Sequence, residues 1–303
     1  MKFSNPVVIA ILLALAFHST AQSPASPTQT QPEVYLIGSS HRNHFLQKYR
    51  YSLVDLGTQI QSLRPDVICG EITPEAYGQV MEGYFPPEAA YLAEMSGRWN
   101  TRFIPSDWRM DSFRQAKAEE AEPAEVKRQA DELTQEELRG FEDFKTPSLY
   151  DYIHSPSYLE RIDTLFEKVI GKDTVSDVAA GDWHERNRRI VQNCLTGAGS
   201  AHRIVFVFGV SHLPQLMHQL KARGITAQIS PRAFAPSGLG SVPEEVVARW
   251  QRNRDSLQGI LSGNINVSAD ALNKVERSSR IKDLDFVMHI YAKGSSHGQR
   301  TSQ

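Results

Sequence analysis

Short apolar runs alternate with segments of helical periodicity along most of this 303-residue chain. Bounded apolar runs of this kind are typical of strands buried on both faces of a parallel sheet. We assign strands to residues 34–37, 66–72, 101–105, 205–208 and 225–229. Between them apolar side chains recur at spacings of three and four, as in 49–63 and 213–220, which predicts helices that pack on the sheet. The pattern therefore predicts an α/β fold, with a mostly parallel sheet flanked by helices.

Residues 111–172 interrupt this alternation. The segment is mostly charged, is rich in Glu, Lys and Ala from 116 to 144, and contains no strand-like run. We expect it to form a helical cap inserted over the sheet. After it, one long helix is expected over about 174–195, and 243–292 reads as helical with a break at Gly263-Asn264. These last helices are expected to pack back onto the sheet.

Both ends of the chain lack the alternating pattern. Lys2, an apolar stretch over 7–17 and the small residues at 19–21 together predict a secretory signal peptide, residues 1–21. A polar leader (22–31) and a polar tail (294–303) are expected to be disordered, which leaves 32–293 as a single folded domain. The protein is thus predicted to be exported, to the periplasm or beyond, and no later segment is apolar enough to span a membrane.

Composition excludes some partners. The formal net charge is −2 and no basic stripe occurs, so nucleic acid is not an expected partner, and the oligomeric state stays open. Cys69 and Cys194 are the only cysteines. Because Cys69 falls in a predicted strand and Cys194 near the end of a predicted helix, we expect two buried free thiols, with a disulfide as the alternative.

The same short motif follows two of the predicted strands. Gly38-Ser39-Ser40-His41 comes after the first strand, and Gly209-Val210-Ser211-His212 comes after the fourth. We expect each glycine to permit a sharp turn as the chain leaves the sheet. Ligand sites of open parallel sheets lie at the carboxyl ends of the strands, so His41 and His212 are predicted to meet in one site. The alternative is a pair of hydrogen-bonded histidines that only hold loops together.

Glu71 is the strongest candidate to join the histidines. It lies toward the end of the second predicted strand, where burial of a carboxylate requires a partner or a metal. A salt bridge from Glu71 to Arg109 or Arg186 is the alternative interpretation. Asp107, just after the third strand, is a weaker candidate. Arg186 and Asn187 lie on the helix before the second motif and point about 100° apart, so we expect one of them to reach the cleft, where an arginine would suit an anion or an oxyanion.

Together these segments resemble the TraB/Tiki/GumN family. The resemblance rests on the two GxxH motifs, Glu71, Asp107-Trp108-Arg109 and Glu185-Arg186-Asn187, which occur in the family's order from about residue 34 to 229. Trp108 separates an Asp and an Arg that the family places side by side. The family belongs to a superfamily with the erythromycin esterases and the ChaN haem-binding proteins. The resemblance implies a secreted hydrolase that acts on a peptide, an ester or a small molecule.

Two mechanisms follow from this resemblance. His41, Glu71 and His212 could hold a divalent metal, for which Mn, Co, Fe and Zn all suit the ligand types, and leave one position for water. Alternatively Glu71 could act as the general base without a metal. His44 is a weaker ligand candidate that we expect to lie in an exposed loop. A haem or small-ligand binder of the ChaN type and a non-catalytic interaction protein remain open, whereas Ser40 and Ser211 lack the GxSxG context of a serine nucleophile.

Overall fold

Five parallel strands form one sheet at the centre of the chain. The computed structural model describes residues 31–295, with side chains to residue 291. Within this range the strand order is β3-β2-β4-β1-β5. The strands are β1 Glu33–Ser39, β2 Val67–Gly70, β3 Arg102–Pro105, β4 Arg203–Gly209 and β5 Ala227–Ile229. The α/β prediction is thus confirmed, and the apolar residues of β1 and β4 are almost all buried.

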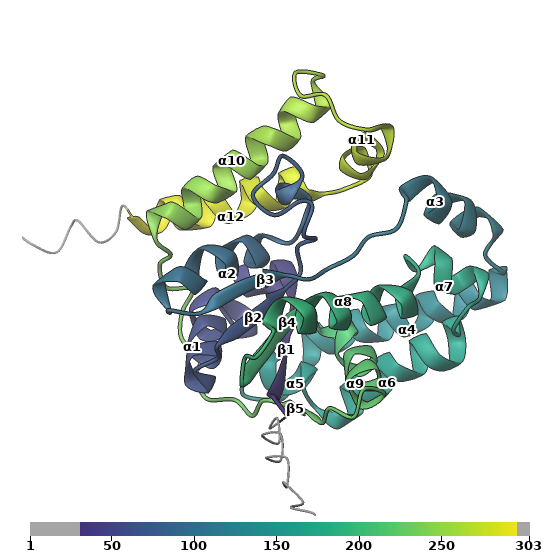
Figure 1. Cartoon of the computed structure of the whole chain (residues 1–303), viewed down its shortest axis with the longest axis horizontal. Helices are drawn as coiled ribbons and strands as arrows, with labels where there is room; N and C mark the ends of the chain where they lie inside the picture. Colours follow the sequence, from purple (N-terminus) through teal and green to yellow (C-terminus); the bar gives the residue numbers. More distant parts are fainter. Residues whose placement is uncertain (1–30, 296–303) are drawn as a thin grey trace, which may run out of the picture. The chain divides into compact units, whose positions relative to one another are not determined.

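Helices cover both faces of the sheet (Figure 1). Helices α1 (Leu53–Leu63) and α2 (Pro87–Arg98) follow β1 and β2, while α8 (Trp183–Ala198) and α9 (Leu213–Lys221) flank β4 in the sequence and lie on the other side. From β1 the chain moves toward the β3 edge, and from β4 it moves toward the β5 edge. Since β1 and β4 are neighbours, the order of the sheet reverses between them, and such a reversal opens a crevice at the carboxyl ends of the two strands.

The expected cap segment consists of helices joined by loops and contains no strand. Its elements are α3 Ser112–Ala121, α4 Ala124–Asp143, α5 Leu149–Ile153, α6 Pro156–Thr164 and the π-helix η4 Leu165–Ile170. The helix predicted over 174–195 is two helices, α7 (Val175–Ala179) and α8. Gly181 and Asp182 break it with φ angles of 89° and 57°, a left-handed conformation that no helix interior accommodates.

The C-terminal helices do not pack on the sheet, contrary to our expectation. They are α10 Glu244–Leu261, α11 Ala269–Glu276 and α12 Arg280–Ser295. Helices α10 and α12 pack against α2 and the short 3₁₀ turn η3 (Glu82–Tyr84), because α2 already covers that face of the sheet. The buried Trp250 indole donates a hydrogen bond to the Pro87 carbonyl at the start of α2, 2.8 Å away.

Cys69 and Cys194 form a disulfide, which corrects the expectation of two free thiols. Cys69 lies on β2 and Cys194 on α8, and the bond ties the sheet to the helix on its face across 125 residues of sequence. Burial alone did not distinguish the alternatives, because both half-cystines are fully buried. Among the described residues no helix is long and apolar enough to cross a membrane. The predicted signal peptide, nearly all of the leader and residues 296–303 of the tail lie outside the described residues.

Candidate active site

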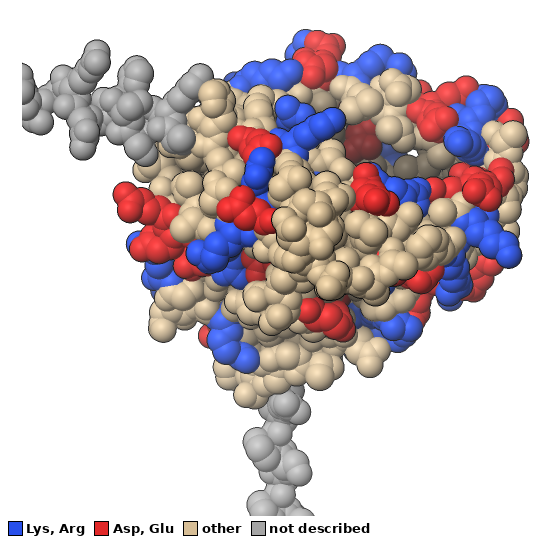
Figure 2. Space-filling model, turned by 90° about the horizontal axis from the view of Figure 1, so that it is seen from above, with Lys and Arg blue, Asp and Glu red and all other residues tan. Residues whose placement is uncertain are grey.

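The two GxxH histidines line one cavity of about 500 Å³ where β1 and β4 end. Glu71, Arg109 and Arg186 line the same cavity, and Glu137 and Phe141 of α4 contribute to its wall from the cap. We call this space the histidine cavity. Acidic and basic side chains are interspersed over the hollowed face of the molecule in Figure 2. The chain thus brings His41, Glu71, Arg186 and His212 together, as the motifs predicted.

His41 pairs with a carboxylate that the sequence did not reveal. Its Nδ1 lies 2.6 Å from Oε1 of Glu88, a buried residue in the first turn of α2. The Ser39 hydroxyl donates to the same oxygen at 3.0 Å, whereas Glu88 Oε2 has no partner within the described range. Burial opposes protonation of His41, but Glu88 and, more weakly, Glu71 raise the pKa of His41 above the ordinary histidine value. The same pairing lowers the pKa of Glu88 to about 2 in spite of its burial.

The backbone holds His41 in an uncommon conformation. His41 has a φ of 47°, in the left-handed region, and its side chain remains 41% exposed. Non-glycine residues in this region carry strain and cluster at functional sites. The conformation sets the ring across the end of β4, where a Cβ added to Gly209 would lie 2.7 Å from His41 Nε2 and 3.5 Å from Glu71 Oε2.

The chain leaves the sheet at Gly209, where β4 ends and a 3₁₀ turn (Val210–His212) begins, but neither motif glycine adopts the left-handed conformation that favours glycine. Gly209 has a φ of −46°, and Gly38 is not among the positive-φ glycines. Each is needed because another group lies where a side chain would be: the His41 ring at Gly209, and the Val210 side chain, 2.9 Å from a Cβ built on Gly38. The motif therefore marks close packing at the strand ends.

His212 has neutral partners. Its Nδ1 lies 2.7 Å from Oδ1 of Asn187, whose amide group donates to the Trp183 carbonyl. Because that donation makes Oδ1 the acceptor, Nδ1 of His212 carries the proton and Nε2 keeps a lone pair. The ring stacks on Trp183, with centroids 4.2 Å apart, and Trp183 stacks on Phe166 of the π-helix. Burial, together with Arg186 and Arg109, holds the pKa of His212 well below its ordinary value.

Glu71 sits in a buried cluster of two carboxylates and two guanidinium groups. Its Oε1 accepts from Arg109 and Arg186, each at 3.1 Å, and its Oε2 accepts from the Gly209 N–H at 3.0 Å. Asp107 binds the same two arginines at 2.8 to 3.0 Å, and they lower its pKa although burial opposes this. The alternative interpretation, a salt bridge from Glu71 to Arg109 or Arg186, is thus confirmed, and Glu71 pairs with both arginines. The Nη1 atoms of both arginines have no hydrogen-bond partner within residues 31–291.

Arg186 and Asn187 divide their roles as the helical geometry predicted. Arg186 reaches Glu71, Asp107 and the cavity, whereas Asn187 is fully buried and contacts the cavity only through the His212 ring. His154, which the sequence did not single out, accepts the Gly38 N–H at 2.7 Å and fixes the end of β1. Burial lowers its pKa to about 4.

Both oxygens of Glu71 are hydrogen-bonded, to the two arginines and to the Gly209 N–H. The two histidines bind Glu88 and Asn187 through Nδ1, a second contact that is typical of metal-ligating histidines and leaves Nε2 as the ligand atom. In the described part of the chain, one set of three ligand atoms lies within 4.8 Å of one another, from Asp163, Glu167 and His218 outside this cavity. His44 is fully buried, contrary to expectation, and both its nitrogens bind backbone groups, so it has no lone pair for a metal. Metal binding by His41, Glu71 and His212 remains a prediction from the resemblance.

Comparisons of the chain with protein-family models, with curated proteins and with solved structures found no match. Function is therefore inferred from the geometry of the cavity and from the motifs.

Proposed function

We propose that the chain is an exported hydrolase of the TraB/Tiki/GumN kind, which cleaves an ester or amide bond with a water molecule activated by His41. The observation that carries the proposal is the difference between the two histidines of one cavity. Glu88 favours the protonated form of His41, whereas the surroundings of His212 favour its neutral form. Titratable groups whose surroundings separate their pKa values in this way are typical of acid–base catalysis.

His41 takes the role of general base. As the water oxygen bonds to the carbonyl carbon, a water proton passes to Nε2 of His41, and Glu88 stabilises the resulting imidazolium. The carbonyl oxygen becomes an oxyanion, which the guanidinium groups of Arg109 and Arg186 in the cavity wall can stabilise. When the tetrahedral intermediate collapses, the leaving group takes the proton from Nε2 and the carbonyl re-forms. His212 Nε2 accepts one hydrogen bond from the substrate or the water.

Hydrolysis in the presence of a chelator tests this proposal. We expect the purified protein to hydrolyse a 4-nitrophenyl ester or a reporter peptide after treatment with EDTA, and His41→Ala to abolish that activity. His202→Ala, a change at an exposed histidine outside the cavity, is the matched control. Activity that EDTA removes and Mn²⁺ or Co²⁺ restores would replace the proposal with a metal-dependent mechanism. A Soret band with no hydrolysis would favour haem binding.

Export is part of the same proposal. It is supported by the N-terminal signal-peptide pattern and by the Cys69–Cys194 disulfide, since disulfides persist mainly in oxidising compartments. Mass spectrometry of the protein recovered from the producing cells should find an N-terminus at or close to Gln22. An intact Met1 would contradict export by signal-peptide cleavage.

A further inference from the structure

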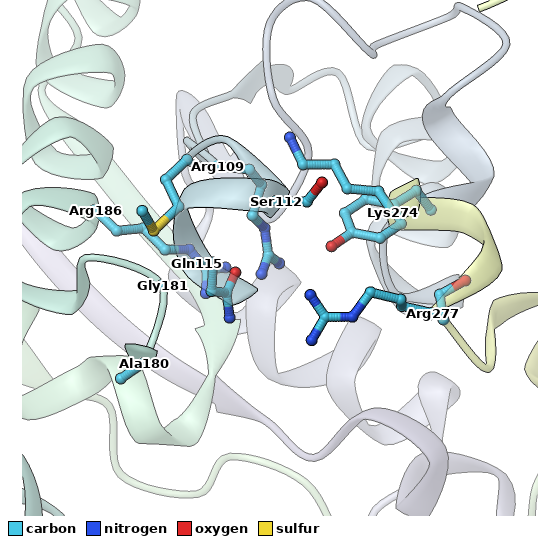
Figure 3. Close-up of a pocket in the computed structure, with 11 residues that line it drawn as sticks. Arg109, Ser112, Gln115, Ala180, Gly181, Arg186, Lys274 and Arg277 are labelled. Carbon is cyan, nitrogen blue, oxygen red and sulfur yellow. The ribbon is translucent and has the colours of Figure 1, made fainter. Parts of the chain in front are cut away.

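A second pocket, of about 230 Å³, adjoins the histidine cavity. The two spaces share Arg109 and Arg186, and Lys274 and Arg277 of the C-terminal region line the far side of the second one. We call it the arginine pocket. Figure 3 shows the guanidinium groups of Arg109 and Arg277 directed toward the same space. Its volume is several times the ~30 Å³ that a water molecule takes in the liquid, enough for a small polar group.

No acidic residue lines this pocket. The carboxylates that pair with its four cations lie outside its wall: Glu71 and Asp107 bind Arg109 and Arg186, Asp270 binds Lys274 at 2.7 Å, and Glu119 binds Arg277 at 2.6 Å. Arg277 uses only Nη2 for that pair, so its Nε and Nη1 have no partner within the described residues. Together with the Nη1 atoms of Arg109 and Arg186, these N–H groups are donors without acceptors. Such a convergence of guanidinium donors suits an oxyanion.

The neutral part of the pocket wall is suited to the same kind of group. Ser112, Gln115 and Tyr84 line it and can donate further hydrogen bonds. Ala180 and Gly181 also line it, at the turn before α8. Four cations and three neutral donors therefore surround the same small space.

We infer that the arginine pocket binds a carboxylate or phosphate group of the substrate while the scissile bond lies in the histidine cavity. This inference rests on the proposed hydrolase function and adds the substrate class. Arg109 and Arg186 line both spaces, so one substrate can place its anionic group on one side of these arginines and its carbonyl on the other. The preferred substrate is then an ester or amide with an anionic group near the bond that is cleaved.

Binding and turnover test this inference separately. Inorganic phosphate or succinate should raise the Tm of the full chain, and the shift should be lost in Arg277→Gln, retained in part in Arg277→Lys and unchanged in Arg252→Gln, an exposed change on α10. For turnover, 4-nitrophenyl hemisuccinate is compared with 4-nitrophenyl butyrate. We expect the anionic ester to have the higher kcat/KM, and Arg277→Gln to lower the ratio of the two values at least tenfold.

The outcomes separate the two proposals. Anion binding that depends on Arg277, with no hydrolysis of any ester or peptide, would support the anion site and contradict the hydrolase proposal. Hydrolysis without anion binding and without preference for the anionic ester would contradict the anion site and support the hydrolase proposal. A stronger response to phosphate than to succinate would identify the group as a phosphate, and the reverse a carboxylate. Thermal unfolding of each variant without anion shows whether it is folded.

Discussion

His41 and His212 end the same four-residue motif, line the same cavity and differ in almost every contact. His41 follows β1 in a left-handed conformation, with its ring partly exposed and its Nδ1 on a carboxylate. His212 leads directly into α9, with its ring buried, stacked on Trp183 and held by an amide. Burial opposes the imidazolium of both rings. Glu88 offsets this at His41, whereas the Asn187 amide supplies no charge that could offset burial, Arg186 and Arg109 at His212.

Each ring is held by a helix on a different face of the sheet. Glu88 comes from α2, which covers one face, and Asn187 comes from α8, which covers the other. In this doubly wound sheet, two neighbouring strands therefore each end in a histidine, and each histidine binds a residue from a different helix. The repeated motif supplies two equivalent positions, and the helices make them chemically unequal.

Loss of each ring should have unequal effects on hydrolysis. His41→Ala removes the general base, and we expect kcat/KM to fall by about 10³. His212→Ala removes one hydrogen-bond acceptor, which corresponds to about tenfold. Steady-state kinetics of both variants give the comparison, and Tm values exclude unfolding as the cause. Equal losses would show that the two rings share one role.

The charge of Glu88 should set the pH dependence of activity. His41 must be neutral to accept a proton, so activity falls as the pH drops through its raised pKa. Glu88→Gln removes the charge that raises this pKa. We therefore expect the acidic limb of the kcat/KM profile to move to lower pH, and the plateau to fall by about 10² because the imidazolium loses its stabilising charge.

A control variant on the same helix tests whether the shift of the acidic limb depends on the Glu88–His41 pair. Glu94→Gln alters a carboxylate on the same helix that pairs with Arg249 instead of a histidine. It should leave the acidic limb in place. An acidic limb that Glu88→Gln does not move would remove His41 from the role of base.

The His41 ring should make Gly209 intolerant of a side chain. The φ of −46° allows alanine, so the obstacle to Gly209→Ala is the His41 ring, 2.7 Å from the added Cβ. We expect the ring to move away from Glu88, kcat/KM to fall about tenfold, and stability to fall by about 1–3 kcal/mol. Gly97→Ala on α2 is the control, because its Cβ meets nothing within 4 Å. A Gly209→Ala variant as active as the Gly97→Ala variant would exclude this packing role.

Features that depend on one segment could be predicted from the sequence, and features that depend on two distant segments could not. The parallel strands and the two histidines at their ends follow from local patterns, and so does the position of Arg186 on its helix. Glu88 had no such signal, because an acidic residue in a first helical turn is ordinary. Only the packing of α2 beside the end of β1 turns it into the partner of His41.

The disulfide and the glycine roles follow the same rule. Cys69 and Cys194 each read correctly as buried, but their pairing requires α8 to lie over β2. The motif glycines were read as turn residues because a sequence shows no neighbour in space. In the structure the ring at Gly209 comes from 168 positions earlier, which only the β1–β4 register brings into contact.

A single isosteric change should make His212 resemble His41. Asn187→Asp places a carboxylate at Nδ1 of His212, where the wild type has an amide 2.7 Å away. The new charge favours the imidazolium, while burial, Arg186 and Arg109 still oppose it, so we expect the pKa of His212 to rise. The histidine Cε1–H resonance followed by NMR over pH measures this rise, and Asn187→Leu, which introduces no charge, is the control. If the two variants titrate alike, the partner at Nδ1 does not set the difference between the two rings, and burial and the nearby arginines must do so.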